Sequence, residues 1–352
     1  MTNDTMCDLI EGLPDAVALR CLARVPFCYH NQLQLVCRSW KFALRSHELF
    51  KVRCEVNVTE ELLCVLAFDP ENIWQLYDPL RDRWLTLPVM PSEIRHLARF
   101  GVASVGGKLF VLGGGSDRVD PLTGDHDRIF ATSEVWSYDP ISREWARRAN
   151  MILPRAMFAC CALDDKIIVA GGFTSFRRSV SRAEIYDPDT DTWAPLPDLC
   201  QTHTSACSGV VIRGKMHVIH KGLSTVQILQ DGARGWVVED YGWLQGPMAV
   251  VDGDPYVLNG GFILKQQQEN LMMDKVLLPT SEFKRRIAFG MIGLRDEIYV
   301  IGGVLGPGPT NQSIKQLCDV DVLRVGSRPG WRLAAPMTKC RGSILGCALL
   351  KI

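Results

Sequence analysis

The sequence contains no apolar run of the roughly 18 residues that a membrane-spanning helix needs. Its first residues, MTNDTMCD, also lack the basic start and the apolar stretch that mark a secretory signal peptide. We therefore expect a protein of the cytoplasm or nucleus that does not bind membranes. In those compartments its 13 cysteines are expected to remain reduced thiols.

Neither sign of charge is in excess, because 39 Lys and Arg residues balance 39 Asp and Glu residues. Such a chain has no overall field that would draw it to nucleic acid, so binding must depend on a local surface. With 352 residues, 47% of them hydrophobic, the chain is long enough to bury one large core and a small appendage.

Signatures of catalysis, nucleotide binding and metal binding are also missing. No Gly-x-x-x-x-Gly-Lys-Ser/Thr segment is present to cradle phosphates, and no Cys-x-x-Cys pair is present at zinc spacing. The adjacent Cys160 and Cys161 lie in an apolar strand pattern and are expected in the core. We expect no catalytic residue, no metal and no cofactor.

Two segments have a faint resemblance to metal sites. Cys200, His203 and Cys207 fall at a junction between repeats, where three ligands are not expected to converge on zinc. Residues 116–127 are rich in acidic side chains but lack the spacing of a calcium-binding loop. We expect a solvated loop there.

Residues 11–53 are expected to form three short helices. Pro14 and Asp15 suit the start of the first helix, Asn31 suits the cap of the second, and the third carries Trp40. The second helix is expected to carry three apolar residues: Leu33, Leu35 and Val36. Such a small unit buries little surface, so it is expected to need a partner.

This segment resembles the F-box in four features: Leu13-Pro14, Leu22, the run from Leu35 to Trp40, and Leu49-Phe50. In that family the module docks on a Skp-type adaptor, which in turn binds a cullin. The resemblance implies an apolar interface whose buried anchors each contribute about 2 kcal/mol or more. The expected adaptor-binding residues are Leu13, Pro14, Leu22, Val36 and Trp40. The alternative is that the helices only cap the rest of the fold.

A repeat follows residue 55. Apolar segments that end in paired glycines recur at 108–114, 166–172, 255–261 and 297–303. Between them, Tyr-Asp-Pro followed by Trp also recurs: Tyr77 with Trp84, Tyr138 with Trp145, and Tyr186 with Trp193. Paired glycines permit positive φ or close packing, and Asp-Pro marks a turn. Each unit is expected to form a four-stranded blade, and a closed ring of blades would cover every open face.

The repeat resembles the kelch motif, and the chain resembles the plant F-box/kelch proteins over nearly its whole length. Second strands are expected at 63–68, 108–114, 166–172, 216–222, 255–261 and 297–303, which predicts six blades. The fourth blade departs from the pattern, with His220-Lys221-Gly222 in place of paired glycines, and the fifth lacks a clear Tyr-Asp-Pro and Trp.

The predicted fold is therefore all-β: a six-bladed kelch β-propeller with a small N-terminal three-helix F-box. The expected divisions are a tail at 1–10, the F-box at 11–53 and the propeller at 54–352. The first blade begins at its second strand, whereas the segment from Gly342 onward looks like a first strand without the rest of its blade. We expect that segment to pair with the strand near Val65 and close the ring.

In an antiparallel blade, the loops after the second strand and the junctions between blades lie at one end of the ring. Long loops are expected there at 115–133, 173–182, 262–274 and 304–316. The candidate substrate-binding residues are at the junctions: Arg99, Arg155, His203, Arg286 and Arg341. Guanidinium groups there would favour an acidic or phosphorylated segment of a partner. The alternative is that arginine at this repeat position packs on a neighbouring tryptophan or ties loops together.

The resemblance implies a substrate-recognition subunit of a Skp–cullin–F-box ubiquitin ligase that directs bound proteins to ubiquitination and proteasomal degradation. The implied partners are a Skp-type adaptor, a cullin reached through it, and a protein substrate on the propeller. The chain itself is expected to catalyse nothing. The alternative is a kelch propeller outside a ligase that binds a metabolite or acts as a metal-dependent enzyme on a small molecule.

Overall fold

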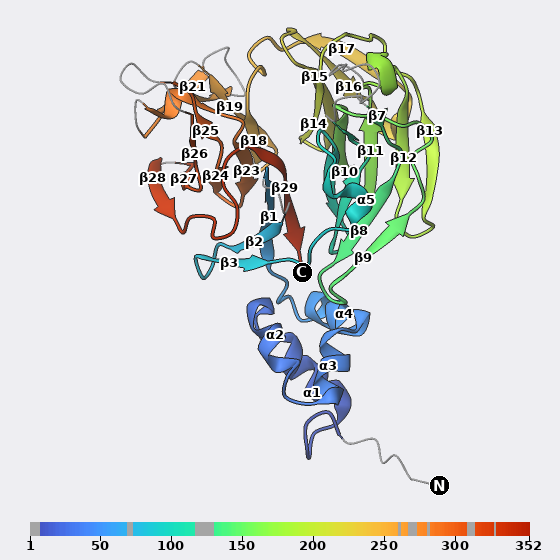
Figure 1. The fold of residues 1–352 in the computed structure, drawn as a ribbon, viewed down its shortest axis with the longest axis vertical. Helices are drawn as coiled ribbons and strands as arrows, with labels where there is room; N and C mark the ends of the chain where they lie inside the picture. The colour runs from blue at the N-terminus through green and yellow to red at the C-terminus, as the bar shows by residue number, and fades with distance from the viewer. Residues whose placement is uncertain are drawn as a thin grey trace.

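The computed structural model describes residues 8–68, 73–116, 130–259, 262–266, 273–279, 282–307, 314–326 and 329–352. A group of short helices near the N-terminus lies at one end of a ring of β-sheets (Figure 1). Within these residues, no helix combines the length and the apolar character that crossing a membrane requires.

The helical part contains four α-helices and one 3₁₀ turn. They are α1 (Asp15–Ala23), η1 (Phe27–Tyr29), α2 (His30–Leu33), α3 (Arg38–Leu44) and α4 (His47–Glu55). Their shared core contains five buried residues: Leu22, Ala23, Leu44, Leu49 and Val52. This core is small, in keeping with the short helices that supply it.

The expectation of three helices was wrong in its details. Ser46 begins a fourth helix, α4, because its hydroxyl accepts a hydrogen bond from the Leu49 amide. Asn31 lies inside α2 and is not its cap. Val36 lies outside α2, because the chain turns there and becomes extended at Cys37, which caps α3.

Six four-stranded antiparallel sheets form the blades, and their strands are given from the centre outward. Blade 1 contains β29 (Ile344–Lys351), β1 (Glu61–Ala67), β2 (Trp74–Asp78) and β3 (Arg83–Thr86). Blade 2 contains β4 (Gly101–Val105), β5 (Lys108–Leu112), β8 (Val135–Asp139) and β9 (Glu144–Arg148). Blade 3 contains β10 (Ala159–Leu163), β11 (Lys166–Ala170), β12 (Ala183–Asp187) and β13 (Thr192–Leu196).

The other three blades have the same order. Blade 4 contains β14 (Cys207–Ile212), β15 (Lys215–His220), β16 (Thr225–Leu229) and β17 (Trp236–Asp240). Blade 5 contains β18 (Met248–Val251), β19 (Asp254–Asn259), β20 (Phe262–Gln266) and β21 (Met273–Leu277). Blade 6 contains β23 (Gly290–Leu294), β24 (Glu297–Ile301), β27 (Val320–Arg324) and β28 (Gly330–Ala334).

Minor elements connect the blades. Two small sheets contain β6 (Gly115–Ser116) with β7 (Phe130–Ala131), and β22 (Arg286–Ile287) with β25 (Val304–Leu305) and β26 (Lys315–Gln316). The remaining helices are α5 (Ser92–Arg95), η2 (Ser175–Arg177), η3 (Asp231–Ala233) and η4 (Glu282–Arg285).

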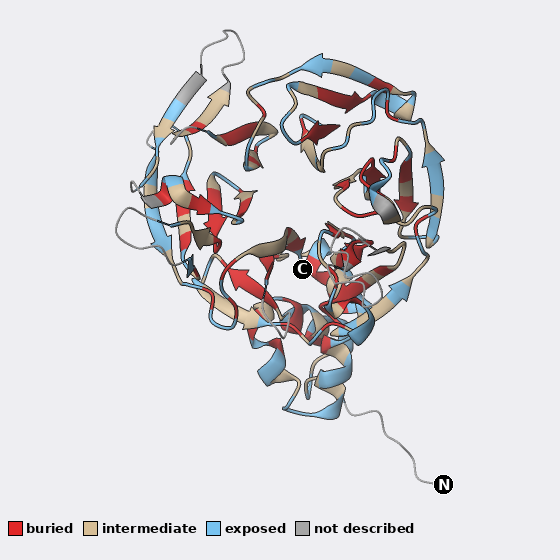
Figure 2. Ribbon diagram, turned by 45° about the horizontal axis from the view of Figure 1, so that its top comes forward, coloured by how far each residue is buried: buried red, intermediate tan, exposed pale blue. Residues whose placement is uncertain are grey.

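The innermost strands form a closed circle, in which β29 contacts β4 and the contacts continue through β10, β14, β18 and β23 back to β29. Figure 2 shows the six sheets around a common centre, with exposed residues concentrated on the outer strands. The ring is joined inside blade 1, where β29 pairs with β1 and Cys347 lies opposite Val65. The prediction of six blades is confirmed.

Tryptophans fill most of the wedge-shaped spaces between neighbouring blades, which we call wedges. On the fourth strand of five blades, the indole Nε1 donates a hydrogen bond to a backbone carbonyl of the preceding blade or of the segment that follows it. The donors and acceptors are Trp84 and Ala335, Trp145 and Pro88, Trp193 and Ala149, Trp236 and Pro197, and Trp331 and Leu277, at 2.7–3.2 Å. The fourth strand of blade 5 contains no tryptophan.

Paired glycines end the second strands because the neighbouring backbone leaves no space for a side chain. At Gly172, with φ +84°, an added Cβ would lie 2.7 Å from the Ala156 carbonyl oxygen. Both the conformation and the close approach therefore favour glycine.

The expected long loop at 262–274 was wrong. Residues 262–266 form β20, the third strand of blade 5, and β21 begins at Met273. The expectation misplaced these strands because blade 5 lacks the Tyr-Asp-Pro and Trp markers. Of the other expected loops, residues 117–129 and 308–313 lie outside the described residues, as does most of the acidic segment 116–127.

Candidate functional site

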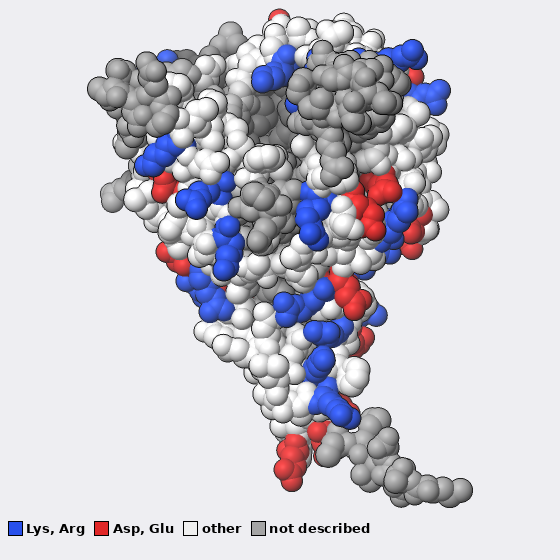
Figure 3. Space-filling model, in the orientation of Figure 1, with Lys and Arg blue, Asp and Glu red and all other residues white. Residues whose placement is uncertain are grey.

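The helical end of the molecule exposes several large apolar side chains. Leu35 and Val36, in the turn before α3, are 86% and 61% exposed, and Phe42 on α3 is 74% exposed. Figure 3 shows a broad area at this end with neither acidic nor basic atoms, beside a row of Lys and Arg. Apolar side chains gathered on an otherwise polar surface are typical of a protein-binding site.

The five predicted adaptor-binding residues have different environments. Pro14 and Val36 are exposed and Leu13 is half-buried, so all three have surface to offer a partner. Trp40 is half-buried, packs on the helical core and donates its indole N–H to the Leu9 carbonyl at 2.7 Å. Its main role is therefore to hold the module together.

Leu22 was wrong as a contact residue, because it is only 2% exposed and lies in the core of the helical part. The prediction omitted Phe42, which is one of the most exposed apolar side chains in the described part of the chain. The spacing between Phe42 and Leu44 was a signal for this exposure. Residues two apart on a helix face different sides, so when Leu44 is buried, Phe42 points away from the core.

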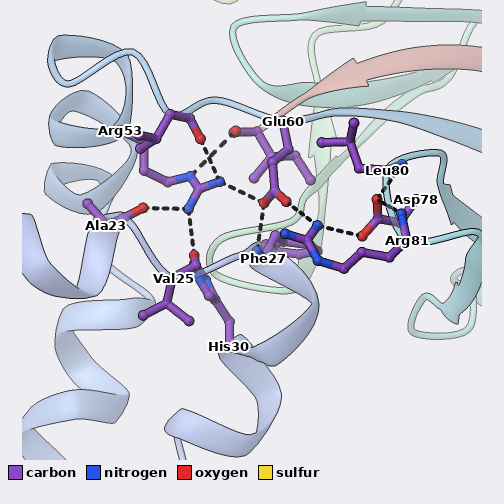
Figure 4. A network of polar contacts seen from close by, with 11 residues as sticks. Ala23, Val25, Phe27, His30, Arg53, Glu60, Asp78, Leu80 and Arg81 are labelled. Atoms are coloured by element: carbon purple, nitrogen blue, oxygen red, sulfur yellow. Dashed lines mark hydrogen bonds and ion pairs between the residues drawn. The ribbon is translucent and has the colours of Figure 1, made fainter.

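A buried network of polar contacts joins the helices to the propeller (Figure 4). Arg53 of α4 is 1% exposed, and its guanidinium donates to the carbonyls of Ala23, Val25 and Val58 at 2.7–3.1 Å. It also donates to Glu60 Oε2 at 2.8 Å, and its Nε lies 3.5 Å from the Ile352 carbonyl. The Arg53 side chain thus links α4 to the end of α1 at Ala23, to the segment after α1 at Val25, and to Ile352.

Glu60 extends this network into blade 1. Its Oε1 accepts from Arg81 at 2.8 Å, and Arg81 also donates to Asp78 at 2.9 Å (Figure 4). The other carboxylate oxygen of Glu60, Oε2, accepts a hydrogen bond from the Phe27 amide at 2.6 Å. The Glu60 backbone also exchanges two hydrogen bonds with Ile352. The closing strand of the ring and the helices therefore share one set of contacts.

His30 lies at the edge of the same network. Its Nε2 is 3.0 Å from the Val25 carbonyl, which can only accept, so this nitrogen carries a proton. Burial, assisted by the positive charge of Arg53, lowers the pKa of His30 to about 4. The ring is therefore neutral at physiological pH.

Blade 2 adds further contacts with the helices. Arg143 donates to the Asn31 side chain, and His47 lies 3.3 Å from Asp139. Asp139 and Arg143 lie at the turn between β8 and β9, the third and fourth strands of blade 2, so the helices occupy that end of the ring beside blades 1 and 2. The opposite end, where the first strands begin, contains the predicted substrate-binding residues.

Two of those residues are inside the protein, and the structure contradicts their assignment to a binding surface. Arg155 is fully buried, where it pairs with Glu184 and donates to the carbonyls of Gly171 and Arg182. Arg286 is also buried, and it pairs with Asp321 of blade 6. Both arginines tie a junction to the third strand of their own blade, so they cannot contact a substrate in this conformation.

The other three predicted residues lie nearer the surface. Arg99 and Arg341 are exposed and precede β4 and β29, which are neighbouring innermost strands. His203 is half-buried, with its ring 4.6 Å from the ring of His220. Arg99 and Arg341 are therefore the two predicted residues with exposed side chains.

No group of three or more His, Cys, Asp or Glu side chains in the described segments is arranged to hold a metal ion. Cys207 Sγ lies 3.3 Å from His220 Nδ1, whereas Cys200 Sγ contacts the Trp236 carbonyl instead. Cys160 and Cys161 pack into different clusters on the two faces of blade 3, as expected, and burial raises the pKa of Cys161 to about 12.

Comparison with known proteins agrees with this architecture. Residues 10–52 match the F-box domain, and residues 96–152 and 154–199 match the Kelch motif. The fold and these matches define an F-box/kelch-repeat protein, and the chain belongs to that family. The predicted family resemblance is thereby confirmed.

Two of the relatives match nearly the whole chain. It is 59% identical over 351 residues to the F-box/kelch-repeat protein SKIP30 of Arabidopsis thaliana, with 99% of each chain covered. It is 29% identical over 373 residues to the F-box/kelch-repeat protein At1g16250 of the same plant, with 97% of each covered. Among solved structures, YjhT shares the fold with a TM-score of 0.54 at 14% identity, covering 76% of this chain and 96% of that one.

Proposed function

We propose that the chain is the substrate-recognition subunit of a Skp–cullin–F-box ubiquitin ligase. The helices bind a Skp-type adaptor, which in turn binds a cullin, and the propeller binds a protein substrate. The complex ubiquitinates that substrate in the cytoplasm or nucleus and so directs it to the proteasome. The chain itself performs no chemical step.

The exposure of Leu35, Val36 and Phe42 is the observation that carries this proposal. Burying such side chains against a partner removes apolar surface from water, and a few of them dominate the affinity of a typical interface. The Arg53 network supports the second half of the proposal, because it fixes the helices to the ring. A substrate on the propeller is then held near the ligase at high effective concentration.

Adaptor binding can be tested with purified proteins. The double variant Val36→Glu/Phe42→Glu should bind a Skp-type adaptor at least about 100-fold more weakly than the wild type, because two apolar anchors are replaced by charges. The control is Leu333→Glu on β28, a similar change at a residue that is 74% exposed on the propeller. Equal adaptor binding by the wild type and the double variant would contradict the proposal.

We further propose that Arg99 and Arg341 favour an acidic or phosphorylated segment of the substrate. Replacing both with alanine should reduce substrate capture in cells with a blocked proteasome while adaptor binding stays unchanged. The control is Arg324→Ala, because its side chain is 69% exposed on the third strand of blade 6. Unchanged capture by the double variant would remove this assignment and leave the adaptor interface untouched.

A further inference from the structure

A cavity of about 550 Å³ lies between blades 4 and 5. Its walls come almost entirely from blade 4 and the segment after it, and Pro255 contributes from blade 5. This volume is within the range of roughly 300–1,000 Å³ that is usual for small-molecule sites. The cavity is separate from the helices, which contact blades 1 and 2, and neither Arg99 nor Arg341 lines it.

The sequence of blade 5 explains why a cavity occurs at this wedge. In the other blades a tryptophan on the fourth strand reaches back to the preceding blade. In blade 3 this residue, Trp193, is paired with Tyr186 across the two outer strands. The corresponding pair in blade 5 is Met273 and Gln266, so neither aromatic residue is present.

The cavity walls combine apolar and polar side chains. Ile212, Ile228 and Leu244 provide an apolar surface, and Tyr241 and Trp243 add aromatic rings. The two cationic residues of the lining are already paired, Arg213 with Asp254 and Lys215 with Asp231, and Glu239 adds a carboxylate to the wall. The site therefore favours a neutral, largely apolar molecule over a strongly anionic one.

His217 supplies a directed polar group. The side chain is 7% exposed, and its Nδ1 lies 2.9 Å from the Lys215 carbonyl, so Nδ1 carries the proton. Burial lowers the pKa of His217, which keeps the ring neutral. Its Nε2 is consequently an acceptor that can receive a hydrogen bond from a ligand hydroxyl.

A ligand hydroxyl can donate its proton, so it matches the acceptor that His217 supplies within this cavity. Trp243 adds its ring to the wall, whereas its indole Nε1 is buried away from the cavity surface.

We propose that the wedge between blades 4 and 5 is a binding site for a flat, neutral, largely apolar molecule that carries a hydroxyl group, such as a phenolic compound. The hydroxyl donates to His217, and the aromatic body packs against the apolar wall. None of the residues proposed for substrate capture or adaptor binding lines this site.

The probe is 2-naphthol, tested against the purified full-length chain by ligand-observed NMR and isothermal titration calorimetry. We expect one bound molecule per chain. The variant His217→Phe keeps an aromatic ring but removes the acceptor, and it should weaken binding at least about fivefold. The variant Val237→Trp should abolish binding by filling the cavity, which Val237 lines. Its control is Leu333→Trp, on the fourth strand of blade 6, which should bind as the wild type does.

Three outcomes would overturn the proposal: no binding to the wild type, equal binding by Val237→Trp, or equal binding of 2-methoxynaphthalene, which cannot donate. Circular dichroism establishes that each variant is folded. If Val237→Trp does not fold, the comparison of His217→Phe with the wild type decides the outcome, because that change preserves volume.

Discussion

Arg53 of α4 and Glu60, which precedes β1, form a buried ion pair in which Nη2 lies 2.8 Å from Oε2. Each partner is also held by other groups, Arg53 by backbone carbonyls and Glu60 by Arg81. A buried charge is tolerated only when its hydrogen bonds are satisfied in this way. The pair therefore fixes the position of the helices relative to the ring.

Replacing Arg53 with methionine should lower the free energy of unfolding by about 3–5 kcal/mol, because Glu60 and several carbonyls lose a buried partner. Chemical denaturation measures this change. The matched control is Arg324→Met, which breaks an exposed pair with Asp296 and should change stability by about 1 kcal/mol or less. Similar losses in both variants would show that the buried pair has no special role.

Leu22 and Val36 should respond in opposite ways to truncation. Leu22→Ala should lower the free energy of unfolding by about 2–5 kcal/mol because it leaves a cavity in the helical core. Val36→Ala should leave stability nearly unchanged, since Val36 is 61% exposed, but should weaken adaptor binding. Thermal unfolding and an adaptor titration on the same two variants measure both effects. If Leu22→Ala were stable but bound the adaptor weakly, while Val36→Ala bound it normally, Leu22 and not Val36 would be the contact residue.

Arg155→Met should destabilise the propeller by about 3–5 kcal/mol, because Glu184 would lose its buried partner. Arg341→Met removes an exposed arginine at the same end of the ring and should have little effect on stability. Denaturant unfolding of the two variants tests this difference. A stable Arg155→Met variant would contradict a stabilising role for its buried pair with Glu184.

Stability should depend on pH through His30. Its folded-state pKa of about 4 lies below the ordinary value of 6.5, so between these values the unfolded chain binds a proton that the folded chain does not. The free energy of unfolding should therefore fall as pH decreases from about 6.5 to 4, by up to about 3 kcal/mol from this group. His30→Gln, which retains a donor for the Val25 carbonyl, should show a shallower fall. Parallel pH profiles for the two proteins would rule out this contribution.

Removal of residues 342–352 should lower the melting temperature severely, because β1 would lose its partner β29 and the ring would be open. The control is Lys351→Ala, which changes an exposed side chain on the same strand and should melt as the wild type does. Differential scanning calorimetry compares the three proteins. A truncated chain with unchanged melting would contradict closure of the ring by β29.

The sequence was sufficient to predict the blades because each marker residue has a local cause. Gly172 stands where a side chain would collide with Ala156 and Phe158, in the junction that leads into its own blade, and Trp193 reaches the segment after the preceding blade through one hydrogen bond. The pairing of the C-terminal segment with the strand near Val65 could likewise be predicted, because no first strand of blade 1 precedes β1 in the sequence. Blade 5 lacks these markers, and its third strand was misplaced for that reason.

The roles of the arginines could not be read from charge alone. Arg155 and Arg286 carry the same charge as Arg99, but each has an acidic residue at a matching position of the third strand of its own blade. That repeated pairing was a signal in the sequence that the prediction did not use. The Arg53 network gave no comparable signal, because most of its acceptors are backbone carbonyls from distant segments.

The pairing of β1 with β29 also has a consequence for synthesis. During translation β1 leaves the ribosome long before residues 344–351, so the nascent chain must carry an unpaired strand edge until they emerge. Such an edge is prone to aggregation, and chaperones bind species of this kind. Because Ile352 contacts both Arg53 and Glu60, the contacts between the helices and the ring are complete only at this late stage. The last strand to be made therefore completes both the ring and its junction with the helices.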